Sequence, residues 1–137
     1  MISELCEPDP AAINAIAALW RACDLTRPWN DPHADIFRAI AHPTAALLIA
    51  RDPEIVGTVM VGDDGHRGAI YYLAVAPTHQ RTGLGRDLLS AAEDHLKTNG
   101  CPKLNLVIRA ENTAVAAFYK ACGYAQEDRM MMAKRLM

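Results

Sequence analysis

The sequence predicts a single α/β domain, residues 1–137, in which helices pack on a mixed, mostly antiparallel sheet. At 137 residues and 51% hydrophobic side chains, the chain suits one domain with its own core. Two turn signals, Asp52-Pro53 and Asp64-Gly65, join three strand-like runs and make them antiparallel. A strand, a helix and a strand then follow between Gly68 and Ile108, a crossover that should make those two strands parallel.

The first half of the chain contains a short strand and two helices. We expect the strand in "ISELCE", residues 2–7. Asp9-Pro10 offers an N-cap followed by proline at the first helical position, which predicts a helix over about 10–22. Asp31-Pro32 repeats this pattern and opens a second helix, which ends at His42-Pro43 because the residue before proline avoids helical angles.

The second half alternates strands and helices, and gives the order β-α-α-β-β-β-α-β-α-β. Its predicted strands are "AALLIAR", "EIVGTVMVG", "GAIYYLAVA", "KLNLVI" and, as extended chain at the end, "YAQEDRMMMAKRL". One helix runs from Leu84 to Gly100, and another is capped by Asn112 and closed by Gly123.

Charge and composition exclude several classes of protein. With 14 Lys and Arg against 16 Asp and Glu, the net charge of -2 lacks the basic excess that nucleic acids and anionic membranes attract. The start "MISELCEPDP" has no signal-peptide pattern, and no apolar run approaches about 18 residues. We therefore expect a cytoplasmic protein without nucleic-acid or membrane partners.

The cysteines and histidines give no sign of a metal. Cys6, Cys23, Cys101 and Cys122 are scattered without a CxxC pair, and no histidine pair has metal-ligand spacing. We expect no metal, and reduced thiols in or near the core.

The stretch "HQRTGLGR", residues 79–86, carries chemistry. A strand that leads through a glycine loop into a helix leaves several amides unpaired beside the positive end of the helix dipole, which is an anion site. Gly83 and Gly85 let a phosphate approach, and Arg81 and Arg86 add charge. Neither GxxxxGK[ST] nor GxGxxG with a later acidic residue is present. By itself the loop fits a relaxed turn with solvated arginines equally well.

A second group of residues decides between an anion site and a relaxed turn. Asn112 and Tyr119 follow on a later helix, just before "KACGY". With the loop, they resemble the GNAT superfamily of acyl-CoA-dependent N-acetyltransferases, whose pyrophosphate loop reads [RQ]xxGx[GA]. The resemblance covers nearly the whole chain. More narrowly, "CDLTRPWNDP" and "DGHRGAIYYLAV" look like the bacterial YpeA-type branch, which implies no particular substrate.

The resemblance implies acetyl-CoA as co-substrate, bound on a GNAT-like sheet with helices on both faces and a splayed parallel strand pair. The Arg81–Arg86 loop would hold the pyrophosphate, and Leu73 and Val75 would bond the pantetheine arm like an extra strand. The Val75 amide would polarise the thioester carbonyl. A pure helix cap explains Asn112 equally well. The implied cofactor-binding residues are Leu73, Ala74, Val75, Gln80, Arg81, Thr82, Gly83, Leu84, Gly85, Arg86, Asn112 and Tyr119.

Tyr119 is the expected catalytic residue. A phenol with a reference pKa of about 10 keeps its proton at pH 7 and can donate it to a departing thiolate. Without the resemblance, a core aromatic on an apolar helix face would be the better interpretation of Tyr119.

The general base is missing from the expected site. The runs "AIYYLAV" and "KLNLVI" contain no acid, although GNAT enzymes that acetylate proteins often carry Glu there. Solvated turns explain the remaining candidates better than catalysis does, and these are Asp24, Asp31, Asp63, Asp64 and His66. Trp29 and Asn30 either contact the acceptor or serve packing and helix entry.

The predicted function is acetyl transfer from acetyl-CoA to a primary amine of a small molecule or a peptide, by direct attack on the thioester. The alternative is a noncatalytic acyl-CoA sensor or interaction module, which the acid-free strands favour. A third class, another nucleotide-phosphate binder, leaves Asn112 and Tyr119 unexplained. The chain ends soon after Gly123, which would leave a sheet edge unpaired; a homodimer would cover that edge.

Overall fold

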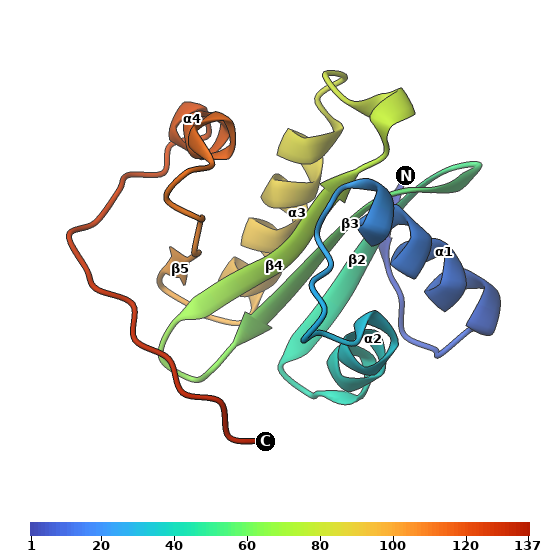
Figure 1. Cartoon of the computed structure of the whole chain (residues 1–137), viewed down its shortest axis with the longest axis horizontal. Coiled ribbons are helices and arrows are strands. Elements are labelled where there is room, and N and C mark those ends of the chain that lie inside the picture. Colours follow the sequence, from blue (N-terminus) through green and yellow to red (C-terminus); the bar gives the residue numbers. More distant parts are fainter. The chain divides into compact units, whose positions relative to one another are not determined.

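The computed structural model describes residues 1–137 (Figure 1). Its helices and strands follow the predicted order as far as the last helix. They are β1 (Ile2–Glu4), α1 (Pro10–Ala22), α2 (Pro32–Ala41), β2 (Ala45–Asp52), β3 (Glu54–Asp63), β4 (Gly68–Val75), the 3-10 turn η1 (Pro77–His79), α3 (Leu84–Thr98), β5 (Leu104–Asn105) and α4 (Thr113–Ala121). The chain divides into two compact units, Met1–Leu106 and Val107–Met137, which are described separately. One domain over residues 1–137 stays a prediction.

The first unit is built on a five-stranded sheet in the order β1-β2-β3-β4-β5. The first four strands pair antiparallel, and β5 pairs parallel to β4. The predicted hairpins and the parallel crossover are thus confirmed. The β1 edge is only three residues long, and a homodimer stays a prediction.

The parallel pair is shorter than the sequence predicts. Only Leu104 and Asn105 join β4, opposite Gly68 and Ala69, so the strand expected over 103–108 is wrong in length. A register irregularity lies further along β4, opposite Val59. Bulges bend and twist a strand, which explains why β5 does not follow β4 beyond its first residues. The rest of that β4 edge has no strand partner.

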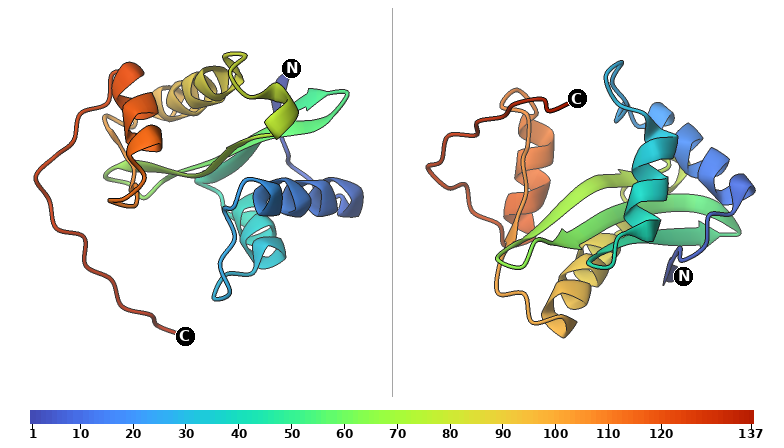
Figure 2. Two further views of the ribbon diagram at one scale, coloured as in Figure 1. Left: turned by 45° about the horizontal axis from the view of Figure 1, so that its top comes forward. Right: turned by 90° about the horizontal axis from the view of Figure 1, so that it is seen from below.

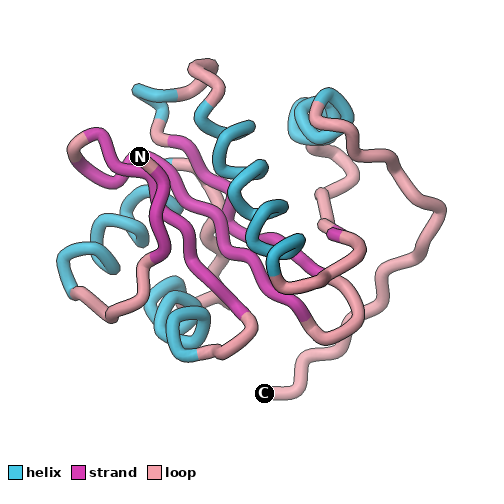
Figure 3. The backbone as a smooth tube through the Cα atoms, turned by 180° about the vertical axis from the view of Figure 1, so that it is seen from behind, coloured by secondary structure: helices cyan, strands magenta, loops and turns pink.

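Helices cover both faces of the sheet, as predicted. Figures 2 and 3 show α1 and α2 on one face and α3 on the other. Neighbouring residues of β3 explain this, because successive side chains in a strand point to opposite faces. A Cβ on Gly57 would lie 2.8 Å from Leu88 Cδ1, so this position faces α3. The neighbouring Thr58 hydroxyl accepts a hydrogen bond from Trp20 Nε1, so Thr58 faces α1. Each face of β3 therefore meets its own helix layer.

The helix boundaries follow the predicted signals with one exception. The Asp31 side chain accepts hydrogen bonds from the amides of His33 and Ala34, at 3.0 and 3.3 Å, and so caps α2. His42 has extended angles, φ -83° and ψ 127°, before Pro43. Asp9 precedes α1 but makes no side-chain cap bond, so only the proline part of that signal holds.

The first unit has buried side chains on both faces of the sheet, and one core cluster lies under α1 and α2. Its largest fully buried side chains include Trp20, Ile16, Ile36, Leu47 and Ile49. Burying one such side chain stabilises the fold by about 1.5–3 kcal/mol. This packing fixes the position of α1 over β3 and β4 and that of α2 over β2.

The second unit consists of α4 and the chain around it. Asn112 accepts a hydrogen bond from the Val115 amide at 3.3 Å, which confirms the predicted cap, and Gly123 follows the helix at φ 94°. The predicted last strand is wrong, because no strand forms after α4. Met130, Met131 and Met132 are exposed; three adjacent apolar residues lack the alternation that gives a strand one buried face.

The four cysteines are all unpaired. Cys6 is exposed and the other three are half-buried, so the expected place in or near the core is wrong for Cys6. Its charged neighbours Glu4 and Glu7 keep that segment in solvent. No group of three or more His, Cys, Asp or Glu is arranged to hold a metal ion, and no helix is long and apolar enough to cross a membrane.

Candidate active site

The glycine loop forms the N-terminus of α3. Gly83 is the N-cap, at a left-handed φ of 88°. The first bond of the helix is donated by the Asp87 amide to the Gly83 carbonyl, at 3.0 Å. The amides before Asp87, from Leu84 to Arg86, therefore have no partner within the helix. Together with the helix dipole they have the arrangement that an anion site requires, and phosphate binding there stays a prediction.

Side chains of the loop hold its backbone in place. Thr82 Oγ1 donates to the His79 carbonyl at 2.6 Å, and Gln80 Nε2 donates to the Val75 carbonyl at 3.1 Å. The His79 ring lies between Thr78 Oγ1, at 2.8 Å, and Asp52 Oδ2, at 3.0 Å. Gln80 and Thr82 thus shape the loop, and their contact with a cofactor stays a prediction. Arg81 also has a left-handed φ, 62°, which the sequence did not signal.

The two arginines of the loop carry its positive charge. Arg81 and Arg86 are exposed, and neither takes part in an ion pair within the chain. Both guanidinium groups are therefore available to an anion at the start of α3.

The open edge of β4 presents the Val75 amide. The Ala76 amide donates to the Val56 carbonyl at 2.7 Å, so Val75, opposite Gly57, is in a non-hydrogen-bonded pair and points its own amide away from β3. Leu73 lies in a bulge, where this alternation is interrupted, and its bond to the pantetheine arm stays a prediction. Ala74 is buried, 3% exposed, and anchors the strand between them.

A bulge lies at Tyr72 and Leu73 of β4. Thr58 pairs with Ala74 and Met60 with Tyr71, so one residue of β3 faces two of β4, and Tyr72 has a left-handed φ of 54°. Such an angle is an outlier for an aromatic residue and needs support from its surroundings.

Side chains from three elements supply that support. Thr58 Oγ1 donates to the Tyr72 carbonyl at 2.8 Å and accepts from Trp20 Nε1 at 2.9 Å. The Tyr72 ring stacks on Trp20, with centroids 3.6 Å apart and an interplanar angle of 5°. Its hydroxyl donates to Asp35 Oδ2 of α2 at 2.6 Å. Burial, followed by the Asp35 hydrogen bond and charge, raises the pKa of Tyr72, so the phenol remains a donor.

Asn112 and Tyr119 belong to the second unit. Asn112 uses its side-chain oxygen as the cap of α4. The Tyr119 ring is buried and meets Phe118 and Tyr124 edge-on, with centroids 5.2 and 5.5 Å away. Burial of the phenol, and to a smaller extent its electrostatic interaction with Cys122, raises the pKa of Tyr119 to about 12. The catalytic role of Tyr119 and the cofactor contact of Asn112 stay predictions.

The candidate bases named from sequence have local structural roles. The Asp24 carboxylate forms an ion pair with the Arg27 guanidinium at 3.7 Å, and the Asp31 side chain caps α2. The carboxylates of Asp63 and Asp64 accept hydrogen bonds from backbone amides of their own turn. The bonds from the Arg67 and His66 amides lower the pKa of Asp64. Sequence reasoning missed Asp35, because an acid in the first turn of a helix ordinarily serves the helix dipole and nothing in the sequence links α2 to β4.

Trp29 and Asn30 lie in the turn between α1 and α2. The Asn30 amide donates to the Arg27 carbonyl at 3.0 Å. The Trp29 side chain is 57% exposed, which argues against a packing role for its ring. Contact of either residue with an acceptor stays a prediction.

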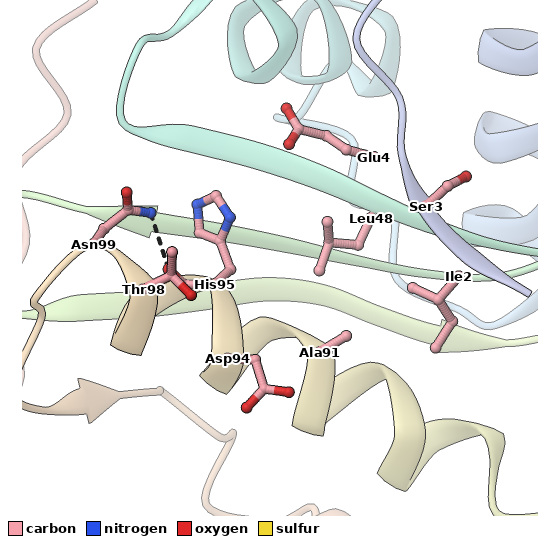
Figure 4. Close-up of a pocket in the computed structure, with 9 residues that line it drawn as sticks. All are labelled: Ile2, Ser3, Glu4, Leu48, Ala91, Asp94, His95, Thr98 and Asn99. Atoms are coloured by element: carbon pink, nitrogen blue, oxygen red, sulfur yellow. Dashed lines mark hydrogen bonds between the residues drawn. The ribbon is translucent and has the colours of Figure 1, made fainter.

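One surface hollow lies away from these groups. It has a volume of about 450 Å³ between β1, β2 and the C-terminal half of α3 (Figure 4). Within the hollow, Asn99 Nδ2 donates a hydrogen bond to the His95 carbonyl at 2.9 Å. The lining residues are Ile2, Ser3, Glu4, Leu48, Ala91, Asp94, His95, Thr98 and Asn99, and none was predicted to bind cofactor or acceptor.

Comparison with known proteins identifies the family. The sequence model described as "Acetyltransferase (GNAT) family" matches residues 13–124. The chain therefore belongs to the GNAT family of N-acetyltransferases. It is 45% identical over 122 residues to an acetyltransferase of Yersinia pestis (strain Pestoides F), covering 88% of this chain and 86% of the relative. An acetyltransferase of Sodalis glossinidius is 44% identical over 123 residues, covering 88% and 87%. The YpeA-type branch stays a prediction.

Solved structures share the fold at low sequence identity. AAC(6')-Iy, in complex with the bisubstrate analogue CoA-S-monomethyl-acetylneamine, superimposes with a TM-score of 0.81 at 16% identity, over 100% of this chain and 98% of that one. Glucosamine-6-phosphate N-acetyltransferase from Arabidopsis thaliana gives 0.73 at 20% identity, over 100% and 98%. These structures confirm the predicted GNAT fold, and the family match with the relatives named acetyltransferase confirms the predicted N-acetyltransferase activity with acetyl-CoA as co-substrate.

Proposed function

We propose that this N-acetyltransferase moves the acetyl group of acetyl-CoA to a primary amine of a small molecule or a peptide, by direct attack of the amine on the thioester. The observation that carries the proposal is the geometry at the end of β4. The unpaired amides at the start of α3 follow a strand whose Val75 amide faces an open edge. A long cofactor with a pyrophosphate and an amide-bearing arm needs both features.

The backbone does most of the proposed cofactor binding. The amides of Leu84–Arg86, with Arg81 and Arg86, bind the pyrophosphate. The Leu73 and Val75 amides bond the pantetheine arm as an added strand would, and the Val75 amide polarises the thioester carbonyl. Acetyl-CoA supplies the activated acetyl group and the thiolate leaving group.

Tyr119 is the proposed proton donor to the departing thiolate. Its pKa, raised to about 12 by burial, keeps the phenol protonated at neutral pH, as a general acid requires. Asn112 contributes through its cap, which fixes the start of the helix that carries Tyr119.

The acceptor is an amine near the turn between α1 and α2, where Trp29 and Asn30 form a wall. Three of the neighbouring proteins are aminoglycoside acetyltransferases, one of them solved with sisomicin. Aminoglycosides carry several primary amines, so polyamino sugars belong among the acceptors to be tested.

The test is free-thiol release from acetyl-CoA by the purified protein. The acceptor panel contains peptide N-termini, lysine peptides, amino acids, polyamines and aminoglycosides, and the melting temperature is recorded with and without acetyl-CoA. We expect thiol release with at least one amine class. If acetyl-CoA raises the melting temperature while no acceptor releases thiol, the proposed acceptor classes are wrong.

A further inference from the structure

One carboxylate near the candidate active site has no cation to balance it. Asp35 is half-buried on α2, and the one hydrogen bond of its side chain is accepted by Oδ2 from the Tyr72 hydroxyl, at 2.6 Å. The ion pairs of the chain join other residues, Arg27 to Asp24 and His79 to Asp52. An ionised carboxylate has about four acceptor positions, so Asp35 keeps most of its capacity for a ligand.

Rigid packing holds this carboxylate where it is. The next residue along α2, Ile36, is fully buried. The ring of its partner Tyr72 is stacked on Trp20, and the Tyr72 carbonyl is bonded to Thr58. A group placed by packing on both sides needs little reorganisation to bind a ligand, which strengthens its effect on affinity.

The position of Asp35 relative to β4 suits the acceptor. Tyr72 lies in the bulge of β4, on the same strand as Val75, whose amide faces the open edge. Asp35 approaches from the α1 and α2 face, whereas the anion site opens α3, on the other face of the sheet (Figure 2). With the cofactor entering from the α3 side, the α2 side is left for the second substrate.

We infer that Asp35, oriented by the Tyr72 hydroxyl, binds the protonated amine of the acceptor before reaction, and that the enzyme therefore selects cationic amines. The ammonium proton then passes to solvent water, and the neutral amine attacks the thioester carbonyl. This rests on the proposed function, because it needs an acceptor amine. Asp35 is a specificity-determining residue and Tyr72 a positioning residue. A charged hydrogen bond at a partly buried site changes affinity by about 10- to 100-fold.

The test compares Asp35→Asn with the wild-type enzyme in steady-state kinetics. Asparagine still accepts the Tyr72 hydrogen bond, so the substitution removes charge and retains the contact. The acceptors are the cationic amine that wild type uses fastest in the panel, and hydroxylamine, which is uncharged at the assay pH. We expect KM for the cationic amine to rise about 10- to 100-fold, with kcat and the KM for acetyl-CoA changing less than threefold. The KM for hydroxylamine should also stay within threefold.

Two further variants separate binding from structure. Asp31→Asn removes the same charge one helical turn away and keeps a good cap, so its kinetics should match wild type within twofold. Tyr72→Phe keeps the stack on Trp20 and loses only the hydroxyl, and it should raise KM for the cationic amine by about threefold to tenfold. Melting temperatures confirm that all three variants fold.

Several outcomes would overturn the inference. They are an unchanged KM for the cationic amine in Asp35→Asn, an equal loss with hydroxylamine, a fall in kcat without a change in KM, and a wild-type enzyme that uses only uncharged amines. If wild type acetylates no amine at all, the proposed function fails and the role of Asp35 fails with it. Active wild type with an unaffected Asp35→Asn variant removes the inference alone.

Discussion

At the scale of single residues, the chemistry depends on a proton that must stay on a phenol until the thiolate leaves. Tyr119 fits this requirement, because burial raises its pKa to about 12. We expect Tyr119→Phe to lower kcat by about 100-fold, in the range of general-acid effects, at nearly unchanged acetyl-CoA affinity. Steady-state kinetics and calorimetric titration with acetyl-CoA measure the two quantities.

Tyr124→Phe is the matched control for this prediction. It deletes a hydroxyl from the ring that meets Tyr119 edge-on, 5.5 Å away, and we expect its kcat to stay within threefold of wild type. Equal turnover in wild type and Tyr119→Phe would remove the proton-donor role.

At the scale of elements, the loop into α3 depends on backbone conformation. Gly83 has a left-handed φ of 88°, and a Cβ there would meet nothing within 4 Å. Alanine at this position strains the backbone by about 1–2 kcal/mol without a clash. We expect Gly83→Ala to weaken acetyl-CoA binding about tenfold, because the loop relaxes and its amides lose their common direction. Calorimetric titration with acetyl-CoA measures the dissociation constant.

The chain contains a natural control for the strain itself. Gly65, in the β3–β4 hairpin, has φ 91° and equally open surroundings. Gly65→Ala should therefore lower the free energy of unfolding as much as Gly83→Ala does, with acetyl-CoA affinity unchanged. The role of the loop would be contradicted if both variants bound acetyl-CoA equally well.

Local signals in the sequence predicted most elements, and long-range contacts decided what they missed. The proline and cap at Asp31-Pro32 fix the start of α2 by chemistry within four residues, so this boundary was predictable. The early end of β5 depends on a bulge in another strand. The last strand was wrong because nothing local in residues 124–136 reveals whether a partner strand is available.

The same distinction applies to the candidate site. The glycine loop is contiguous in sequence, and its place at the start of α3 was predicted together with its function. Asp35 and Tyr72 are far apart in the chain, and each alone is an ordinary residue of a helix or a strand. Their contact requires α2 and β4 to be placed first, and this placement depends on the packing of Trp20 and Ile36.

At the scale of the whole molecule, tyrosine burial makes stability depend on alkaline pH. Burial raises the pKa of Tyr72 in the first unit and of Tyr119 in the second above their ordinary value near 10. The folded chain therefore holds these protons more tightly than the unfolded chain does. The resulting stabilisation is fully present below about pH 10 and is lost as the pH rises through the folded pKa values.

We accordingly expect the free energy of unfolding to fall steeply between pH 10 and 12. In Tyr119→Phe this fall should be smaller, because one of the two protons is no longer linked to folding. Urea midpoints at pH 8, 9, 10 and 11 measure the effect, with Tyr71→Phe as the control because its side chain is 60% exposed. The other groups that titrate between pH 10 and 12 contribute equally to wild type, Tyr119→Phe and Tyr71→Phe. The difference in slope between these proteins therefore reports on the substituted tyrosine. The same slope in wild type and Tyr119→Phe would mean that the Tyr119 phenol exchanges its proton as freely in the folded protein as in the unfolded chain, and would argue against its retention as an acid.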